Sequence, residues 1–254
     1  MVYQYLSDTV NIKKISETDT EGIFEIEGLY SGYGLTIGNA LRRTLLSSLP
    51  GAAITQVKIK NVGHQFTTLE GVIEDIVEIG LNLKKVRFRI NSDEPQVLSL
   101  KVKGENEVIA ANIETNAQVE VVSPDVHIAT ISDKNTELEM EITVEKGLGY
   151  VPVDARKGDK LPIGAIALDA LFSPVLSVNF TVENMRVGDR TDFNRLRLFV
   201  KTDGSITTSS ALRKSSNILQ DHFSKISQVE VKESEPVAVP EKAEKKKTIR
   251  KSKK

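Results

Sequence analysis

Residues 38–48 read Gly-Asn-Ala-Leu-Arg-Arg-Thr-Leu-Leu-Ser-Ser, and they place two adjacent arginines in a stretch that is otherwise apolar or small. The residues that recur at the three- and four-residue spacing of a helix with one buried face are Ile37, Ala40, Leu41, Thr44, Leu45 and Leu49. Pro50 and Gly51 then end the helix. Neighbouring helical residues point about 100° apart, so Arg42 and Arg43 cannot share one patch of solvent. The pattern fits an ordinary solvated helix face, or a helix that is buried on one side and meets a partner on another.

Strand patterns dominate the rest of the chain. Residues 137–145 alternate polar and apolar side chains without a break, as in a strand with one buried and one wet face. Further strands are predicted at 23–30, 57–59, 86–90, 98–102, 176–182 and 196–200, and helices at about 35–49, 70–84 and 208–227. Helices therefore do not alternate with strands, which favours an α+β fold over a doubly wound parallel sheet.

The net charge of −1 hides an uneven distribution. From Lys242 to the end, eight of thirteen residues are basic and only Glu244 is acidic, whereas the preceding residues carry a net −8. The folded body is therefore not a basic nucleic-acid-binding domain. Residues 228–254 lack hydrophobic periodicity, so we expect a disordered basic tail. Its cluster Lys245, Lys246, Lys247, Arg250 and Lys251 is the candidate for non-specific contact with nucleic acid.

Composition excludes several classes of protein. The chain has no cysteine, which rules out disulfides, thiolate chemistry and cysteine-containing metal sites. It has no apolar run long enough to span a membrane, and its first residues lack the basic and apolar regions of a secretory signal. We therefore expect no membrane partner and a cytoplasmic location.

No constellation of residues predicts catalysis. Nucleotidyl transfer uses two metal ions held by clustered carboxylates, but the aspartates between residues 133 and 169 are scattered. His64, His127 and His222 show no ligand spacing, so we expect no metal, no cofactor and no catalytic residue in this chain. Gly32, Gly34 and Gly38 imitate a dinucleotide fingerprint, but the third glycine falls one residue late and no acidic ribose ligand follows.

A family resemblance joins several motifs. Residues 38–51, the segment 70–76 leading to 81–84, the turn Gly147-Leu148-Gly149-Tyr150-Val151-Pro152, Asp169-Ala170 with Ser173-Pro174-Val175, and Val187 with Arg190-Thr191-Asp192 occur in one order over roughly residues 20–227. In this order they resemble the alpha subunit of bacterial-type DNA-directed RNA polymerase. From the residues alone, the glycine pair of the turn indicates a hairpin and residues 190–192 a polar loop.

The resemblance implies a homodimeric, non-catalytic scaffold on which the beta and beta-prime subunits assemble for RNA synthesis. It implies a dimer interface containing Leu41, Leu45, Leu212, Leu219 and Ile226. It implies contact with beta through Arg42, Arg43, Leu46 and Glu70, and contact with beta-prime through Lys84, Leu168, Arg190 and Asp192. The resemblance also implies a location in the bacterial cytoplasm, with a plastid as the alternative.

The resemblance also implies two subdomains. Residues 1–51 and 175–227 would form the dimerisation subdomain, and residues 52–174 an inserted, mostly β subdomain. The family often continues with a small DNA-binding domain, which we expect to be absent here, so that DNA would be reached only indirectly or through the tail. The alternative is a stand-alone nucleic-acid-binding protein that acts through the basic tail; steep salt dependence of binding would distinguish it.

Overall fold

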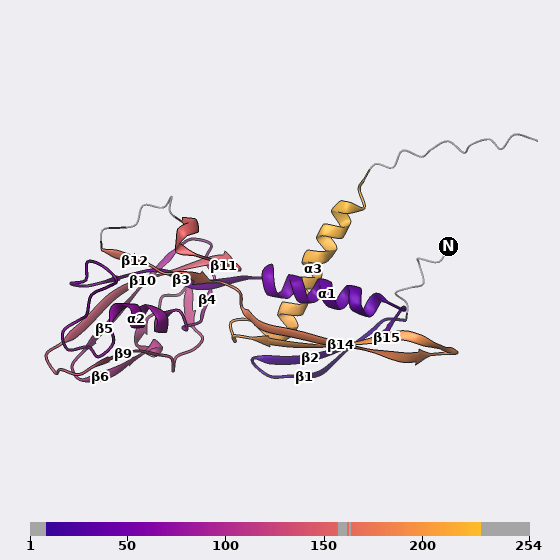
Figure 1. Cartoon of the computed structure of the whole chain (residues 1–254), viewed down its shortest axis with the longest axis horizontal. Helices are drawn as coiled ribbons and strands as arrows, with labels where there is room; N and C mark the ends of the chain where they lie inside the picture. Colours follow the sequence, from indigo (N-terminus) through magenta and orange to yellow (C-terminus); the bar gives the residue numbers. More distant parts are fainter. Residues whose placement is uncertain (1–8, 157–161, 163, 230–254) are drawn as a thin grey trace, which may run out of the picture.

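The computed structural model describes residues 9–156, 162 and 164–229 of the 254, and within them the chain forms two lobes placed end to end (Figure 1). We call residues 9–51 and 175–229 the helical lobe, and the described part of 52–174 the strand lobe. Each has its own hydrophobic cluster, one drawn from residues 24–49 and 175–211 and the other from residues 52–166. The chain passes from the first cluster to the second between residues 49 and 52, and returns between residues 166 and 175.

The helical lobe is a four-stranded antiparallel sheet with two helices on one face. Its strands lie in the order β1 (Asn11–Glu17), β2 (Glu21–Leu29), β15 (Arg190–Thr202) and β14 (Val175–Val187). Helix α1 (Tyr33–Ser47) lies against β14 and β15, and α3 (Thr208–Ile226) crosses α1 and rises away from the sheet (Figure 1). Strands from both ends of the sequence therefore pair in one sheet.

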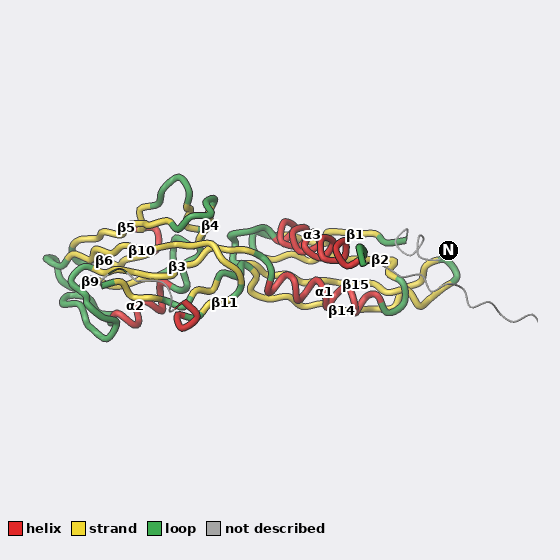
Figure 2. The backbone as a smooth tube through the Cα atoms, turned by 90° about the horizontal axis from the view of Figure 1, so that it is seen from above, coloured by secondary structure: helices red, strands yellow, loops and turns green. Residues whose placement is uncertain are grey.

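The strand lobe is built around a seven-stranded antiparallel sheet (Figure 2). The main path of this sheet is β7 (Ile113–Glu114), β5 (Gln96–Lys103), β10 (Glu137–Leu148), β3 (Pro50–Ile59), β4 (Phe88–Ile90) and β8 (Val119–Val121), with β12 (Ala165–Ala167) also paired to β3. Two small sheets pair β6 (Asn106–Ile109) with β9 (His127–Ile131), and β11 (Tyr150–Val151) with β13 (Ala170–Leu171). Short 3₁₀ turns occupy Ala110–Asn112 and Val153–Arg156. The observed architecture confirms the predicted α+β class and all the predicted strands.

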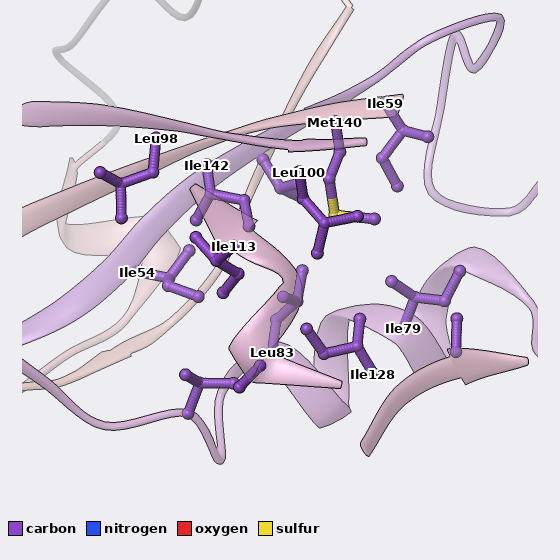
Figure 3. Packing of buried hydrophobic residues seen from close by; sticks show 14 of the residues in the cluster. Ile54, Ile59, Ile79, Leu83, Leu98, Leu100, Ile113, Ile128, Met140 and Ile142 are labelled. Atoms are coloured by element: carbon purple, nitrogen blue, oxygen red, sulfur yellow. The ribbon is translucent and has the colours of Figure 1, made fainter. Parts of the chain in front are cut away.

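Helix α2 (Ile76–Leu83) fills the space under this sheet (Figure 3). Ile79 and Leu83 are fully buried and pack in one cluster with Leu100, Met140 and Ile128 from three strands. The helix is shorter than the predicted range 70–84, because the Asp75 carboxylate accepts a hydrogen bond from the Glu78 amide at 2.7 Å and caps the helix there. Residues 70–75 precede it as turns and bends, with isolated β-bridges at Val72 and Asp75.

Two glycines bring α1 close to the sheet. A Cβ atom at Gly34 would lie 2.6 Å from Val182, and one at Gly38 would lie 2.8 Å from the ring of Phe180. Any larger side chain would push the helix outward. The Asn194 Oδ1 on β15 accepts hydrogen bonds from the amides of Gly32 and Gly34 at 2.9 and 3.4 Å. The glycine pattern that imitates a dinucleotide fingerprint therefore serves helix–sheet packing, and its helix-terminal amides are already used.

The Gly147–Gly149 turn is not a hairpin. The strand β10 ends at Leu148, opposite Pro50, whereas Tyr150 begins β11 and pairs with Leu171 of a different sheet. Gly149, at a φ of 62°, is the corner where the chain leaves the large sheet for the small one. The glycine pair predicted a hairpin, but it carried no information about which strand would be the partner.

The carboxylate of Glu17, at the end of β1, holds the first turn of α3. It accepts hydrogen bonds from the Thr208 hydroxyl at 2.9 Å and from the amide and hydroxyl of Ser209 at 2.8 Å each. Together with an ion pair to Lys14, these bonds lower the pKa of Glu17 to about 2, with the Lys14 contact contributing most. An anion at a helix N-terminus is favoured by the free amides and by the helix dipole.

We predict that Glu17→Gln lowers the free energy of unfolding by about 1–2 kcal/mol at pH 7. The pKa of Glu17 is lower in the folded chain than its ordinary 4.5, so this contribution is present above pH 4.5 and is lost as the pH falls towards 2. Denaturant titrations of both proteins at pH 7 and at pH 3 measure the effect. A gap between the two proteins that stays constant over this range would contradict the assignment.

Candidate functional site

The two arginines of α1 occupy different positions on its surface. Arg42 is half-buried and donates a hydrogen bond to Asn39 Oδ1 at 3.4 Å, while Arg43 is exposed. Neither guanidinium forms an ion pair with a carboxylate in the described part of the chain. Leu46, one turn further on, is half-buried, and its carbonyl accepts a hydrogen bond from the Ser173 hydroxyl at 3.1 Å. The end of α1 therefore presents two guanidinium groups, without a carboxylate partner among the described residues, beside an apolar side chain, a combination suited to a carboxylate-bearing protein surface.

Leu41 and Leu45 are placed differently from the sequence expectation. Their side chains are 5% and 0% exposed and belong to the hydrophobic cluster of the helical lobe. Both side chains pack within the protomer, so almost none of their surface remains for contact with a second copy. This corrects their assignment as interface residues: the helical spacing identified a buried stripe but did not indicate which element would bury it.

Helix α3 divides into a packed half and a free half. Leu212 and Leu219 are partly buried against the cluster of the helical lobe. Every residue from Gln220 to Val229 is exposed, and Phe223 and Ile226 are 62% and 63% exposed. These two apolar side chains extend the stripe of Leu212 and Leu219 beyond the body of the lobe, where α3 projects from the sheet (Figure 1).

The segment before α2 combines a buried carboxylate with an exposed one. Glu74 is 8% exposed; its carboxylate accepts hydrogen bonds from the Thr130 amide at 2.6 Å and the Thr130 hydroxyl at 3.0 Å. The ring nitrogens of His127 lie 2.9 Å from Glu74 and 3.0 Å from Glu107. Burial opposes ionisation of Glu74 most strongly, but these hydrogen bonds outweigh it and lower its pKa. Glu74 thus fastens the segment to β9, and Glu70 remains exposed at its start.

Sequence reasoning missed an exposed apolar row beside Glu70. Ile73, Val77 and Leu81 are 69%, 41% and 54% exposed and follow one another at four-residue spacing along the segment and α2. The buried residues of α2 point to the opposite side, into the sheet (Figure 3). The signal was available: a short helix with apolar residues on two faces has one more face than its own core can cover.

The candidate contacts for the beta-prime subunit form two pairs. Lys84 at the end of α2 forms an ion pair with Asp169 at 3.0 Å. A hydrogen bond from the Val153 amide and this ion pair lower the pKa of Asp169. Leu168 is next to Asp169 and lies against Gly80, where an added Cβ would be 3.1 Å from its side chain. Lys84 and Leu168 therefore lie together in the strand lobe.

The second pair lies in the other lobe. Arg190 and Asp192 form an ion pair at 2.6 Å, which raises the pKa of Arg190 and lowers that of Asp192. The guanidinium lies 4.9 Å from the ring centre of Tyr30 and 5.3 Å from that of Phe193. The predicted polar loop is instead the beginning of strand β15, next to the β14–β15 turn, and this turn lies at the opposite end of the molecule from α2 (Figure 1).

The remaining candidates form no site. His64 and His222 are exposed and far from His127 in the sequence, and within the described ranges no three histidine, cysteine, aspartate or glutamate side chains gather as metal ligands would. No helix in the described ranges is long and apolar enough to cross a membrane. The basic cluster Lys245, Lys246, Lys247, Arg250 and Lys251 lies outside the described residues.

The sequence matches known proteins over most of its length. Residues 57–173 match the family model of the RNA polymerase Rpb3/RpoA insert domain. The chain is 51% identical over 209 residues to the DNA-directed RNA polymerase subunit alpha of Symbiobacterium thermophilum, and 47% identical over 226 residues to that of Moorella thermoacetica. These matches cover 82% and 89% of this chain, and 66% and 72% of the two relatives. The chain belongs to the family of DNA-directed RNA polymerase alpha subunits.

The family match confirms the resemblance drawn from the motifs. A third alpha subunit, from Clostridium botulinum strain Eklund 17B, is 49% identical over 208 residues, which are 82% of this chain and 66% of that protein. The chain thus spans just under two thirds of the length of the Symbiobacterium and Clostridium alpha subunits. The insert-domain match covers most of the strand lobe and includes Glu70, Lys84 and Leu168.

The contact between His127 and Glu74 gives the strand lobe a dependence on pH. The hydrogen bond to Glu74, and to a lesser extent the one to Glu107, raise the pKa of His127 above its ordinary 6.5. Protonated His127 therefore stabilises the fold below pH 6.5, and this contribution is lost as the pH rises through the raised pKa. We predict that the free energy of unfolding of wild type, measured relative to that of His127→Gln, falls between pH 6 and pH 9. The fall should be less than about 1 kcal/mol, since the ring is partly exposed.

Urea titrations of both proteins at the two pH values measure this difference. Glu107→Gln is the matched control, because it removes the more exposed of the two carboxylates and leaves Glu74 in place. A difference between wild type and His127→Gln that grows as the pH rises would reverse the sign and refute the prediction.

Proposed function

We propose that this chain is the assembly scaffold of a bacterial-type RNA polymerase: it dimerises and holds the beta subunit on one protomer and the beta-prime subunit on the other. It contributes no catalytic residue, metal or cofactor to RNA synthesis from ribonucleoside triphosphates. The proposal places the chain in the cytoplasm as part of the enzyme. The observation that carries it is the free half of α3, which presents an apolar stripe to solvent in a chain of the alpha-subunit family.

The free half of α3 supports dimerisation through a second copy of itself. An isolated protomer leaves Phe223 and Ile226 in water, although burying each would contribute roughly 1.5–3 kcal/mol. Leu212 and Leu219 continue the same stripe towards the lobe and are only partly covered. Two antiparallel copies of this helix would cover each other, as in an isologous interface, where the same patch is used by both protomers.

The surface around Arg43 supports binding of a large subunit. Arg42, Arg43 and Leu46 lie on α1, whereas Glu70 lies in the strand lobe beside the exposed row Ile73, Val77 and Leu81. The two groups have opposite charges, and Ile73, Val77 and Leu81 are exposed, so a partner that spans both lobes would need carboxylates, cations and an apolar surface. That combination is typical of a specific protein–protein interface.

The first prediction from the proposal concerns the dimer. Because Ile226 is exposed in the protomer, Ile226→Glu should leave folding unchanged. In the dimer it would bury an unpaired charge, so we expect the dimer dissociation constant to rise at least about 100-fold. Sedimentation equilibrium measures the dimer and thermal unfolding checks the fold. Ser224→Glu, on the same exposed turn, is the control. A dimer of unchanged affinity in the Ile226 variant would count against this interface.

The second prediction concerns the beta subunit. Arg43→Ala should leave the dimer intact and weaken capture of beta by roughly 2–5 kcal/mol, because it would leave a buried carboxylate on the partner unpaired. Titrated pull-down of purified beta on the tagged chain is the measurement. Lys201→Ala removes an exposed cation elsewhere in the helical lobe and should bind beta normally. Equal capture by the two variants would argue against a role for Arg43.

A further inference from the structure

Two arginines of the strand lobe contact the turn that leads into α3, which belongs to the helical lobe. Arg87 and Arg89 are two residues apart around strand β4, so they point to the same side, while Phe88 between them is 1% exposed in the core. Arg89 donates hydrogen bonds to the carbonyl oxygens of Ser205 at 3.0 Å and Gly204 at 3.3 Å. Its remaining amino group forms an ion pair with Glu120 of its own lobe at 2.8 Å.

Arg87 adds a second contact to the same turn. Its Nε lies 4.0 Å from Asp203 Oδ2, and both side chains are well covered, at 17% and 8% exposure. The other oxygen of Asp203 accepts hydrogen bonds from the amide and the hydroxyl of Ser205, which fixes the turn that presents the carbonyls to Arg89. We call Arg87, Arg89 and residues 203–205 the lobe latch.

Other described contacts between the lobes lie near the chain crossings, where the Ser173 hydroxyl donates a hydrogen bond to the Leu46 carbonyl at 3.1 Å. The two chain crossings run side by side: a Cβ at Gly51 would collide with the carbonyl of Phe172 and lie 3.3 Å from Pro174. Adjacent crossings resist separation of the lobes but leave rotation about their common axis to other contacts. Beside the latch, a cavity of about 280 Å³ lies between the two lobes, and its lining includes Phe88, Ile206 and Lys214. The contacts of the lobe latch therefore limit the rotation of one lobe relative to the other.

The angle matters because each candidate partner surface includes both lobes. Arg42 and Arg43 belong to the helical lobe and Glu70 to the strand lobe; Lys84 and Leu168 belong to the strand lobe and Arg190 and Asp192 to the helical lobe. A rigid partner that contacts both members of a set binds tightly only when the lobes are already correctly placed, since ordering them on binding would cost affinity.

We propose that Arg89 is a positioning residue, which fixes the angle between the lobes so that one large subunit can contact both of them. The inference rests on the proposed scaffold function. It does not depend on a direct contact between Arg89 and any partner. Its side chain acts through the carbonyls of Gly204 and Ser205, so it sets geometry and leaves dimerisation through α3 unchanged.

The first test measures the lobe angle alone. The chain has no cysteine, so Glu94→Cys in the strand lobe and Thr181→Cys on β14 accept spin labels selectively. Labelled chain is diluted into excess unlabelled chain, so that each distance lies within one protomer. Arg89→Ala should broaden the distance distribution. Glu120→Gln should not, because it removes only the ion pair within the strand lobe. An unchanged distribution in Arg89→Ala overturns the proposal.

The second test measures assembly with the 254-residue chain. Arg89→Ala should bind purified beta about tenfold more weakly, with an unchanged dimer dissociation constant. Lys101→Ala is the matched control, because it removes an exposed cation paired only within the strand lobe. A broadened distribution with unchanged capture would overturn the role in assembly. Failure of the unmodified chain to capture beta would instead refute the scaffold function, and the distance measurement would still decide whether the latch exists.

Discussion

The close approach of α1 to strands β14 and β15 is the contact on which the helical lobe depends. Gly34 and Gly38 allow it, because any Cβ at these positions would collide with Val182 or Phe180. With the helix this close, Leu41 and Leu45 reach the cluster of the lobe and are fully covered. The opposite side of the same helix is then the only place left for Arg43, which must face solvent or a partner. Packing on one side thus determines what the other side presents.

The same contact links the two ends of the sequence. Strand β2 precedes α1 by three residues, whereas β14 and β15 come more than a hundred residues later, yet all three form one sheet under the helix. The strand lobe is inserted between them and begins after Gly51. Because it enters and leaves at adjacent crossings, its fold can form around its own cluster, and its orientation depends on side-chain contacts such as those of Arg87 and Arg89. The contacts that fold the strand lobe therefore differ from the contacts that set its orientation.

The sequence predicted well whatever depends on local periodicity. Alternation located strand β10, and three- and four-residue spacing located α1 and α3, each within a few residues. The sequence did not predict which element each periodic stretch would pack against or pair with. The stripe of Leu41 and Leu45 did not reveal whether the same protomer or a second copy would cover it. Gly149 was identified as a turn, but the strand that pairs with Tyr150 lies twenty residues further on. Nor did any motif indicate Glu17, whose importance comes from a helix that begins 191 residues later.

The elongated shape of the protomer bears on how a symmetric scaffold could hold two different partners. A dimer built on α3 presents every surface twice, so identity of sequence cannot assign beta to one protomer and beta-prime to the other. The two candidate contact sets both include the strand lobe, one through Glu70 before α2 and the other through Lys84 at its end. Glu70 and Lys84 are separated only by residues 71–75 and by α2, which is eight residues long, about 12 Å, so large partners on these two sets would overlap on one protomer. Occupation of one set would then exclude the other, and the second partner would have to bind the second protomer.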